Sequence, residues 1–240
     1  MTRVPVLPVP NSSGTTRPRA RAPKSACDSH IHIYDPRFPV KWQNLRAVEN
    51  ASVAEYKLLQ ERVGTTRTIV VQPAAYGTDN SVTLDAVAQL GLDNARGIAV
   101  AHPTVTDTEL VAMADLIERL PGTLVFDHMG RMPQPEGIHH PAFNILRRLI
   151  DTGRVWVKLS GPYLDTKEGA PRYSDITPVG RALAGHAPER CVWGSDWPHP
   201  TEPNVKPDDA VLFDLVQEWT LDEVTRSRIL VGNPAALYGF

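Results

Sequence analysis

The sequence predicts an α/β protein in which parallel strands alternate with helices and form a barrel. Short apolar stretches rich in β-branched residues alternate along the chain with helical patterns, which is typical of a parallel sheet with crossover helices. The sequence has no glycine-rich phosphate loop of the GxGxxG or Walker type, so a doubly wound nucleotide-binding sheet is not supported. Polar residues gather where the strands end, as they do at the active-site face of a barrel.

The individual elements follow from the spacing of the apolar residues. Apolar runs and alternation predict strands over residues 26–34, 66–72, 97–101, 123–126, 155–160 and 191–195. Helical spacing predicts helices over residues 53–62, 80–90, 107–120, 141–152, 176–184, 208–219 and 221–231. Only six βα units are recognisable, whereas a complete barrel has eight in about 250 residues.

The overall composition narrows the classes of function. The chain has 240 residues, a formal net charge of -2 and 42% hydrophobic residues, which suits one large domain. A general nucleic-acid binder would be strongly basic, and a membrane span would need roughly 18 consecutive apolar residues, so we expect neither partner. Two cysteines, Cys27 and Cys191, are too few for a disulfide scaffold and are predicted to be free thiols.

The N-terminal segment differs from the rest of the chain. Residues 1–25 are rich in proline and arginine and are predicted to form a disordered arm, while residues 26–240 form the barrel domain. The alternative is an arm that contacts an acidic partner or a neighbouring subunit. The apolar run at residues 4–9 is too short and too interrupted for a signal peptide, so we expect a cytoplasmic protein.

The candidate catalytic residues are His30, His32, His128 and Asp196. His30 and His32 alternate along the first strand and therefore share a face, where two imidazoles can hold a metal ion or a substrate carbonyl. His128 and Asp196 end two other strands, at the edge where a barrel has its active site. The competing interpretation is structural: histidines on an ordinary strand, and an aspartate that only sets a turn before Trp197.

The candidate substrate-binding residues are Lys158, Tyr163, Arg131, Arg172 and His199. Alternation points Lys158 into the barrel, where it needs either an acidic partner or a substrate carboxylate, and both remain open. The other residues follow strands in loops, where they would meet a small anionic substrate or simply face solvent.

Several motifs occur in one order along residues 26–240: DSHIHIYDPRFP, VFDHMGRMP, VKLSGPY, ERCVWGSDWPH and ILVGNPAALYGF. Together they resemble the amidohydrolase-related family that includes 2-pyrone-4,6-dicarboxylate lactonase and sugar-lactone hydrolases. The resemblance implies a TIM-type barrel and the hydrolysis of a small carboxylated lactone. It also implies that Asp196 activates water, while His30, His32 and His128 polarise the carbonyl.

The same resemblance bears on cofactors. It implies that His30, His32 and Asp196 are the ligands where a divalent ion is bound, with zinc as the expected metal. Some relatives hold zinc and others work without a tightly bound metal, and the sequence leaves both open.

The chain departs from the family in one region. The 20 residues between His102 and Thr123 hold one helix and its turns, whereas the family carries strands four and five there. We therefore expect a shortened barrel with exposed sheet edges, which a second copy of the chain would cover. The alternatives to a lactone hydrolase are a metal-dependent decarboxylase, a lactone isomerase, or an inactive remnant that acts by binding or assembly.

Overall fold

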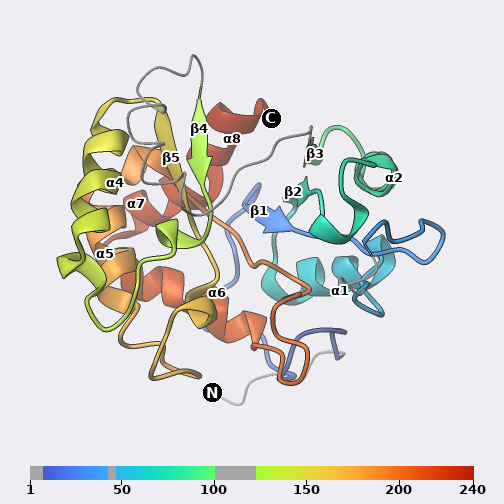
Figure 1. The fold of residues 1–240 in the computed structure, drawn as a ribbon, viewed down its shortest axis with the longest axis horizontal. Coiled ribbons are helices and arrows are strands. Elements are labelled where there is room, and N and C mark those ends of the chain that lie inside the picture. The colour runs from blue at the N-terminus through green and yellow to red at the C-terminus, as the bar shows by residue number, and fades with distance from the viewer. Residues whose placement is uncertain (1–7, 43–46, 101–122) are drawn as a thin grey trace.

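The computed structural model describes residues 8–42, 47–100 and 123–240, which contain two parallel sheets of three strands each (Figure 1). The first sheet has the order β1-β2-β3 and the second has the order β4-β5-β6. Their bounds are β1 Cys27–Ile31, β2 Arg67–Val71, β3 Ala95–Ile98, β4 Leu124–Phe126, β5 Val155–Leu159 and β6 Cys191–Trp193. All four strand pairings are parallel, as the alternation of strands and helices predicts.

The two sheets meet where β1 lies beside β6. The backbone N–H of Asp196 donates to the carbonyl of His30 at 2.8 Å, and the N–H of His32 donates to the carbonyl of Trp197 at 2.8 Å. The first and last strands are therefore neighbours, as they are in a barrel. Within the described residues β3 and β4 pair with no further strand, so these residues do not form a closed barrel.

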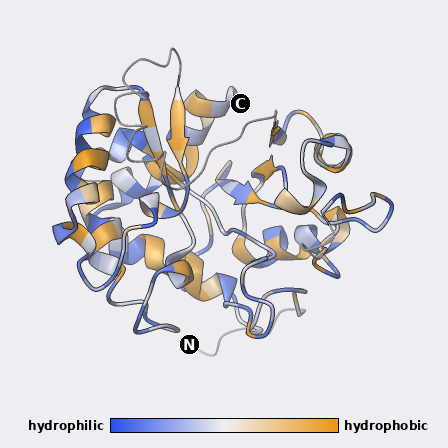
Figure 2. Ribbon diagram, in the orientation of Figure 1, coloured by the Kyte–Doolittle hydropathy of each residue, from blue (hydrophilic) through white to orange (hydrophobic). Residues whose placement is uncertain are grey.

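Helices cover the outside of the sheets (Figure 1). Their bounds are α1 Val53–Val63, α2 Ser81–Leu90, α4 Pro141–Asp151, α5 Thr177–His186 and α6 Asp209–Trp219. In α4 the buried residues are Phe143, Leu146, Leu149 and Ile150, and the helix carries both hydrophobic and hydrophilic residues in Figure 2. This amphipathic spacing buries one face of the helix against the strands. None of the helices in the described ranges is both long and apolar enough to cross a bilayer.

The two remaining predicted helices are those at residues 107–120 and 221–231. The predicted helix at residues 107–120 lies outside the described residues. The predicted helix at residues 221–231 is divided into α7 Glu223–Ser227, a π-helical turn Arg228–Gly232 and α8 Asn233–Tyr238. Pro234 explains the division, because its ring cannot donate a hydrogen bond and crowds the carbonyl four residues earlier.

The N-terminal segment differs from the expected disordered arm. Over residues 8–25 it packs along the domain, and Val9 is 3% exposed. The N–H of Ser13 donates to Pro207, and the indole N–H of Trp197 donates to the carbonyl of Pro10. The prolines do exclude a helix, but an extended segment can satisfy its backbone groups on neighbouring loops.

Candidate active site

Two imidazoles lie together at the carboxyl end of β1. The His30 side chain is 2% exposed, and that of His32, one residue past the strand, is 13% exposed. Their Nε2 atoms are 3.2 Å apart. The HxH spacing therefore aims both rings at one point, as alternate residues of a strand should.

Asp196 approaches the same point from the end of β6. Its Oδ1 atom is 3.5 Å from Nε2 of His30 and 3.4 Å from Nε2 of His32. Its backbone has a φ of 64°, a left-handed conformation that aspartate tolerates better than most residues. This turn directs the carboxylate toward the histidines, so three predicted catalytic residues meet as expected.

Gly194 allows this approach. A Cβ atom at residue 194 would lie 2.6 Å from Cβ of His30 and 2.8 Å from its backbone nitrogen. Backbone atoms cannot move aside as a flexible side chain can. Only glycine lets the end of β6 come this close to the histidine strand.

Hydrogen bonds at the far side of each ring leave Nε2 as the free acceptor. Nδ1 of His32 is 3.0 Å from the carbonyl of Val71, to which it can only donate. Nδ1 of His30 is 3.2 Å from Oδ1 of Asp127 and donates there in the same way. This arrangement, a ring nitrogen bonded to a carbonyl or carboxylate, is typical of metal-binding histidines.

The three facing atoms fit a divalent metal ion. Nε2 of His30, Nε2 of His32 and Oδ1 of Asp196 lie within 4.8 Å of one another. A tetrahedral ion with bonds of about 2.0–2.1 Å holds its ligand atoms about 3.3 Å apart, and the three separations in the protein are 3.2, 3.4 and 3.5 Å. Three acceptors this close repel one another unless a cation or a proton lies between them. A site with three protein ligands also leaves a position for water or substrate.

Lys158 lies behind His30, with a side chain that is 1% exposed. Its Nζ is 2.9 Å from Oδ1 of Asp127 and 3.1 Å from Nδ1 of His30. The sequence left open whether Lys158 meets an acidic side chain or a substrate carboxylate, and in the structure it forms an ion pair with Asp127. Burial works to raise the pKa of Asp127, but the hydrogen bonds and charges of His30 and Lys158 outweigh it and hold the pKa well below its usual range.

Sequence reasoning missed Asp127 because it extended the strand alternation too far. Alternation places Asp127 on the face opposite to Phe126 and therefore away from the site. The strand β4 ends at Phe126, and His128 and Met129 have positive φ values of 51° and 54°. Beyond the last strand residue the period of two no longer applies, so Asp127 and His128 both turn inward.

His128 completes the group of imidazoles. Its ring centroid is 4.8 Å from that of His30, and its Nδ1 is 2.9 Å from Oγ of Ser160. Gly161 makes room for this ring, since a Cβ there would lie 2.8 Å from Nδ1 of His128. All four predicted catalytic residues therefore lie in one cluster.

Tyr163 and His199 lie on the other side of Asp196. The Tyr163 hydroxyl donates to Oδ2 of Asp196 at 2.6 Å and is 2.9 Å from Nδ1 of His199. Nε2 of His199 is 3.1 Å from Oδ2 of Asp209, and both side chains are fully buried. Asp209 is a second residue that sequence reasoning missed, because as the first residue of α6 it looks like an ordinary helix-terminal aspartate.

The two predicted arginines are placed differently. Arg131, with a 54% exposed side chain, forms a two-point ion pair with Asp165 at 2.8 and 3.0 Å. Arg172 is exposed and lines an outer hollow beside Arg19 and Asp214, between α5 and α6. Among the described residues, Arg172 forms no hydrogen bond or ion pair with the histidine cluster.

Burial sets the protonation of the cluster. Burial, assisted by the charge of Lys158, lowers the pKa of His30 to about 4, so this ring is neutral near pH 7. Burial also lowers the pKa of His128. For Asp196, burial works to raise the pKa, but the facing imidazoles of His32, His30 and His128 outweigh it and hold the pKa below its usual value. The cluster thus combines the neutral imidazoles of His30 and His128 with an ionised carboxylate.

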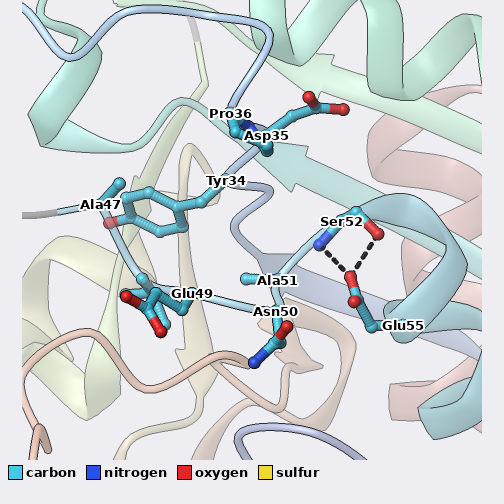
Figure 3. A pocket seen from close by; sticks show the side chains of 10 residues that line it. Tyr34, Asp35, Pro36, Ala47, Glu49, Asn50, Ala51, Ser52 and Glu55 are labelled. Atoms are coloured by element: carbon cyan, nitrogen blue, oxygen red, sulfur yellow. Dashed lines mark hydrogen bonds between the residues drawn. The ribbon is translucent and has the colours of Figure 1, made fainter.

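A separate hollow of about 530 Å³ opens beyond β1 (Figure 3). Tyr34, Asp35 and Glu49 are among its lining residues, and Glu55 is bonded to Ser52 at its edge. None of the four predicted catalytic residues lines this hollow.

Comparison with known proteins identifies the family of the chain. Residues 95–240 match the sequence profile of a family described as amidohydrolase. The chain belongs to the amidohydrolase family. A 4-sulfomuconolactone hydrolase of Rhizobium radiobacter is 32% identical over 285 residues, covering 92% of this chain and 95% of the relative. A D-galactarolactone isomerase of Agrobacterium fabrum is 29% identical, covering 93% of this chain and 94% of the relative.

Solved structures place the amidohydrolase chain in the same fold. A crystal structure of an Agrobacterium tumefaciens protein without ligand has 27% identity and a TM-score of 0.81, covering 93% of this chain and 98% of that one. An amidohydrolase of Burkholderia multivorans with bound zinc has 18% identity and a TM-score of 0.58, covering 90% of this chain and 99% of that one. The fold is thus of the TIM-barrel type, as the sequence predicts.

Proposed function

We propose that this amidohydrolase opens a small carboxylated lactone by hydrolysis. The observation that carries the proposal is the convergence of three imidazoles and one carboxylate from β1, β4 and β6. The similarity to a 4-sulfomuconolactone hydrolase supports a lactone as the substrate.

The groups of the cluster divide the reaction between them. Asp196, ionised at neutral pH, takes a proton from water, and the water oxygen attacks the lactone carbonyl carbon. Negative charge then develops on the carbonyl oxygen, which lies toward His30, His32 and His128. When the bond to the ring oxygen breaks, Asp196 returns its proton to that oxygen. A divalent ion held by His30, His32 and Asp196 would act as a Lewis acid toward the carbonyl.

Arg131 is the residue that we propose for the substrate carboxylate. Its hydrogen bond to Asp165 raises the pKa of Arg131, and the nearby charge of Asp196 acts in the same direction. A substrate anion would take the place of Asp165 in this pair. A planar guanidinium suits a carboxylate in this two-point geometry. Lys158 is already engaged by Asp127 and is not proposed to contact substrate.

A lactone isomerase is the second candidate, favoured by the similarity to D-galactarolactone isomerase. The same carboxylate and imidazoles would then move a proton or acyl group within the substrate rather than admit water to it. Incorporation of oxygen from labelled water into the product separates the two, since only hydrolysis requires it.

We also propose that the barrel is shortened relative to its relatives. The alignment with the sulfomuconolactone hydrolase covers 285 residues, whereas this chain has only 240, so the relative carries segments that this chain lacks. In the described ranges the outer edges of β3 and β4 carry no partner strand. A second copy of the chain is the proposed cover for these edges, which native mass measurement would test.

The decisive experiment measures turnover of a panel of carboxylated five- and six-membered lactones, with and without added zinc. The wild-type chain should open at least one, and Asp196→Asn should retain its fold while losing at least 100-fold in kcat. A matched control is Asp175→Asn, which removes an aspartate of the loop before α5 that bonds Thr166. Equal activity of wild type and Asp196→Asn would exclude the proposed role of Asp196.

A further inference from the structure

A chain of three side chains runs from Asp196 to the first residue of α6. We infer that Tyr163, His199 and Asp209 form a buried relay that fixes the Asp196 carboxylate, and that they position this group rather than bind substrate. The effect of the relay on the reaction rests on the proposed function, but the geometry of the relay does not depend on it. The inference gives Asp209 a role, and it gives Tyr163 and His199 a positioning role in place of the substrate contact that the sequence predicts.

The relay is continuous in hydrogen bonds. Oδ2 of Asp196 accepts from the Tyr163 hydroxyl at 2.6 Å, that oxygen is 2.9 Å from Nδ1 of His199, and Nε2 of His199 is 3.1 Å from Asp209. The rings of Tyr163 and His199 meet edge to face, with centroids 5.2 Å apart. His199 and Asp209 are each 0% exposed, so water does not compete for these contacts.

The proton count of the relay fixes the direction of each bond. The Tyr163 hydroxyl has a single hydrogen, and it faces Oδ2 of Asp196, a carboxylate oxygen that accepts. That hydrogen is donated to Asp196, so the oxygen must accept on its other side, and Nδ1 of His199 must be the donor. The other ring nitrogen, Nε2, faces Oδ2 of Asp209, and this hydrogen bond closes the relay.

Asp209 has no other evident task. Its second oxygen, Oδ1, is buried and has no hydrogen-bond partner among the described residues. Keeping a carboxyl group in such a place is costly unless it serves a partner, and His199 is the partner that the structure provides. Asp209 therefore orients the imidazole, which in turn orients the tyrosine hydroxyl.

The relay makes the two oxygens of Asp196 unequal. Oδ2 is occupied by Tyr163, while Oδ1 faces His30 and His32. Rotation of the carboxylate would break its bond to Tyr163, so one oxygen is held toward the reacting centre. A metal ion at this site would accordingly be bound by one Asp196 oxygen only.

Tyr163→Phe is the first test, because it removes the hydroxyl and keeps the ring. We expect kcat to fall about 10- to 100-fold with KM changed less than threefold, since positioning residues behind a ligand have effects of this size. The affinity of metal-stripped protein for zinc, measured by calorimetry, should fall by about the same factor. The matched control is Tyr76→Phe, which removes another tyrosine hydroxyl, one bonded to the backbone of Asp35, and should leave both values unchanged.

The continuity of the relay is tested with Asp209. Asp209→Ala should reduce kcat and zinc affinity, and Asp209→Asn should restore part of both because its amide can donate to Nε2 of His199. Combining Asp209→Ala with Tyr163→Phe should add less than threefold to the loss from Tyr163→Phe alone, since the chain is already broken. If Asp209→Ala fails to fold, His199→Asn is measured in its place. It removes Nε2, the atom that faces Asp209, and should likewise reduce kcat and zinc affinity.

A spectroscopic readout keeps the relay testable even where no lactone is turned over. The proton between His199 and Asp209 should give a strongly deshielded, slowly exchanging imidazole N–H signal in NMR spectra of the full chain. The signal should be lost in Asp209→Ala and kept in Tyr76→Phe. Absence of the signal in wild type, or a Tyr163→Phe variant that raises KM with unchanged kcat and zinc affinity, would overturn the relay. If wild type shows this signal but turns over no lactone, only the proposed function is overturned, and the relay stands.

Discussion

Nζ of Lys158 lies 2.9 Å from Oδ1 of Asp127, but the two side chains differ in exposure, 1% for the lysine and 44% for the aspartate. Removing the aspartate and removing the lysine should therefore change the free energy of unfolding by different amounts. Asp127→Asn leaves a buried ammonium group without its counter-charge, which should lower the free energy of unfolding by about 3 kcal/mol. Lys158→Met leaves a carboxylate that water can reach, and should cost only about 1 kcal/mol.

Urea unfolding of the two variants measures this difference. Arg226→Met is the matched control, because its pair with Glu223 lies on an exposed helix and should contribute less than about 0.5 kcal/mol. If Lys158→Met proved as destabilising as Asp127→Asn, the different exposure of the two side chains would not be what determines the cost of breaking the pair.

The pKa of His30 predicts a loss of stability in acid. Burial lowers this pKa to about 4 from an ordinary value near 6.5, so below pH 6.5 the unfolded chain binds a proton that the native chain excludes. Stability is therefore full above pH 6.5 and declines as the pH falls toward 4, by roughly 3 kcal/mol. The low pKa values of Asp127 and Asp196 act in the same direction at still lower pH.

Chemical unfolding at a series of pH values tests this expectation. His30→Asn should show a smaller decline between pH 6.5 and 4, because the group responsible is gone. His186→Gln, a change at a surface pair with Asp151, should keep the wild-type profile. An identical profile for His30→Asn and wild type would contradict the role of His30.

The sequence predicted the cluster better than it predicted what surrounds it. The HxH alternation places His30 and His32 together because a strand has a fixed period of two. Asp127 and Asp209 could not be found in this way, because they act from a turn and a helix start whose directions depend on tertiary contacts. The packed N-terminal segment was missed for a similar reason: its composition excludes a helix, but its hydrogen-bond partners, such as Pro207, are far away in sequence.

Arg62 ties that N-terminal segment to the domain. Its side chain is 1% exposed, and its guanidinium donates to Ser12, to the carbonyls of Ser13 and Thr16, and to Asp208. Arg62→Ala should lower the free energy of unfolding by about 3 kcal/mol, because several partly buried acceptors lose their donor. It should also speed proteolytic cleavage within residues 8–25.

Limited proteolysis with mass analysis follows this cleavage. Arg226→Ala provides the comparison, since it removes an arginine that contacts Glu223 and Thr220 but not the N-terminal segment. Equal cleavage of Arg62→Ala and wild type would mean that other contacts, such as that between Trp197 and Pro10, hold the segment without Arg62.

Gly194 sets the distance between the histidine strand and the aspartate strand. In Gly194→Ala the new methyl group would lie 2.6 Å from Cβ of His30, so β6 must move away from β1. We expect a loss of about 1–3 kcal/mol in stability and of about 100-fold in kcat, since displacements near 1 Å at reacting groups have such effects. Gly185→Ala is the control: nothing lies within 4 Å of its Cβ position in α5, and the change should stabilise the chain by about 0.5–1 kcal/mol. Should Gly194→Ala keep full activity, close contact of the two strands would not be what aligns Asp196 with His30 and His32.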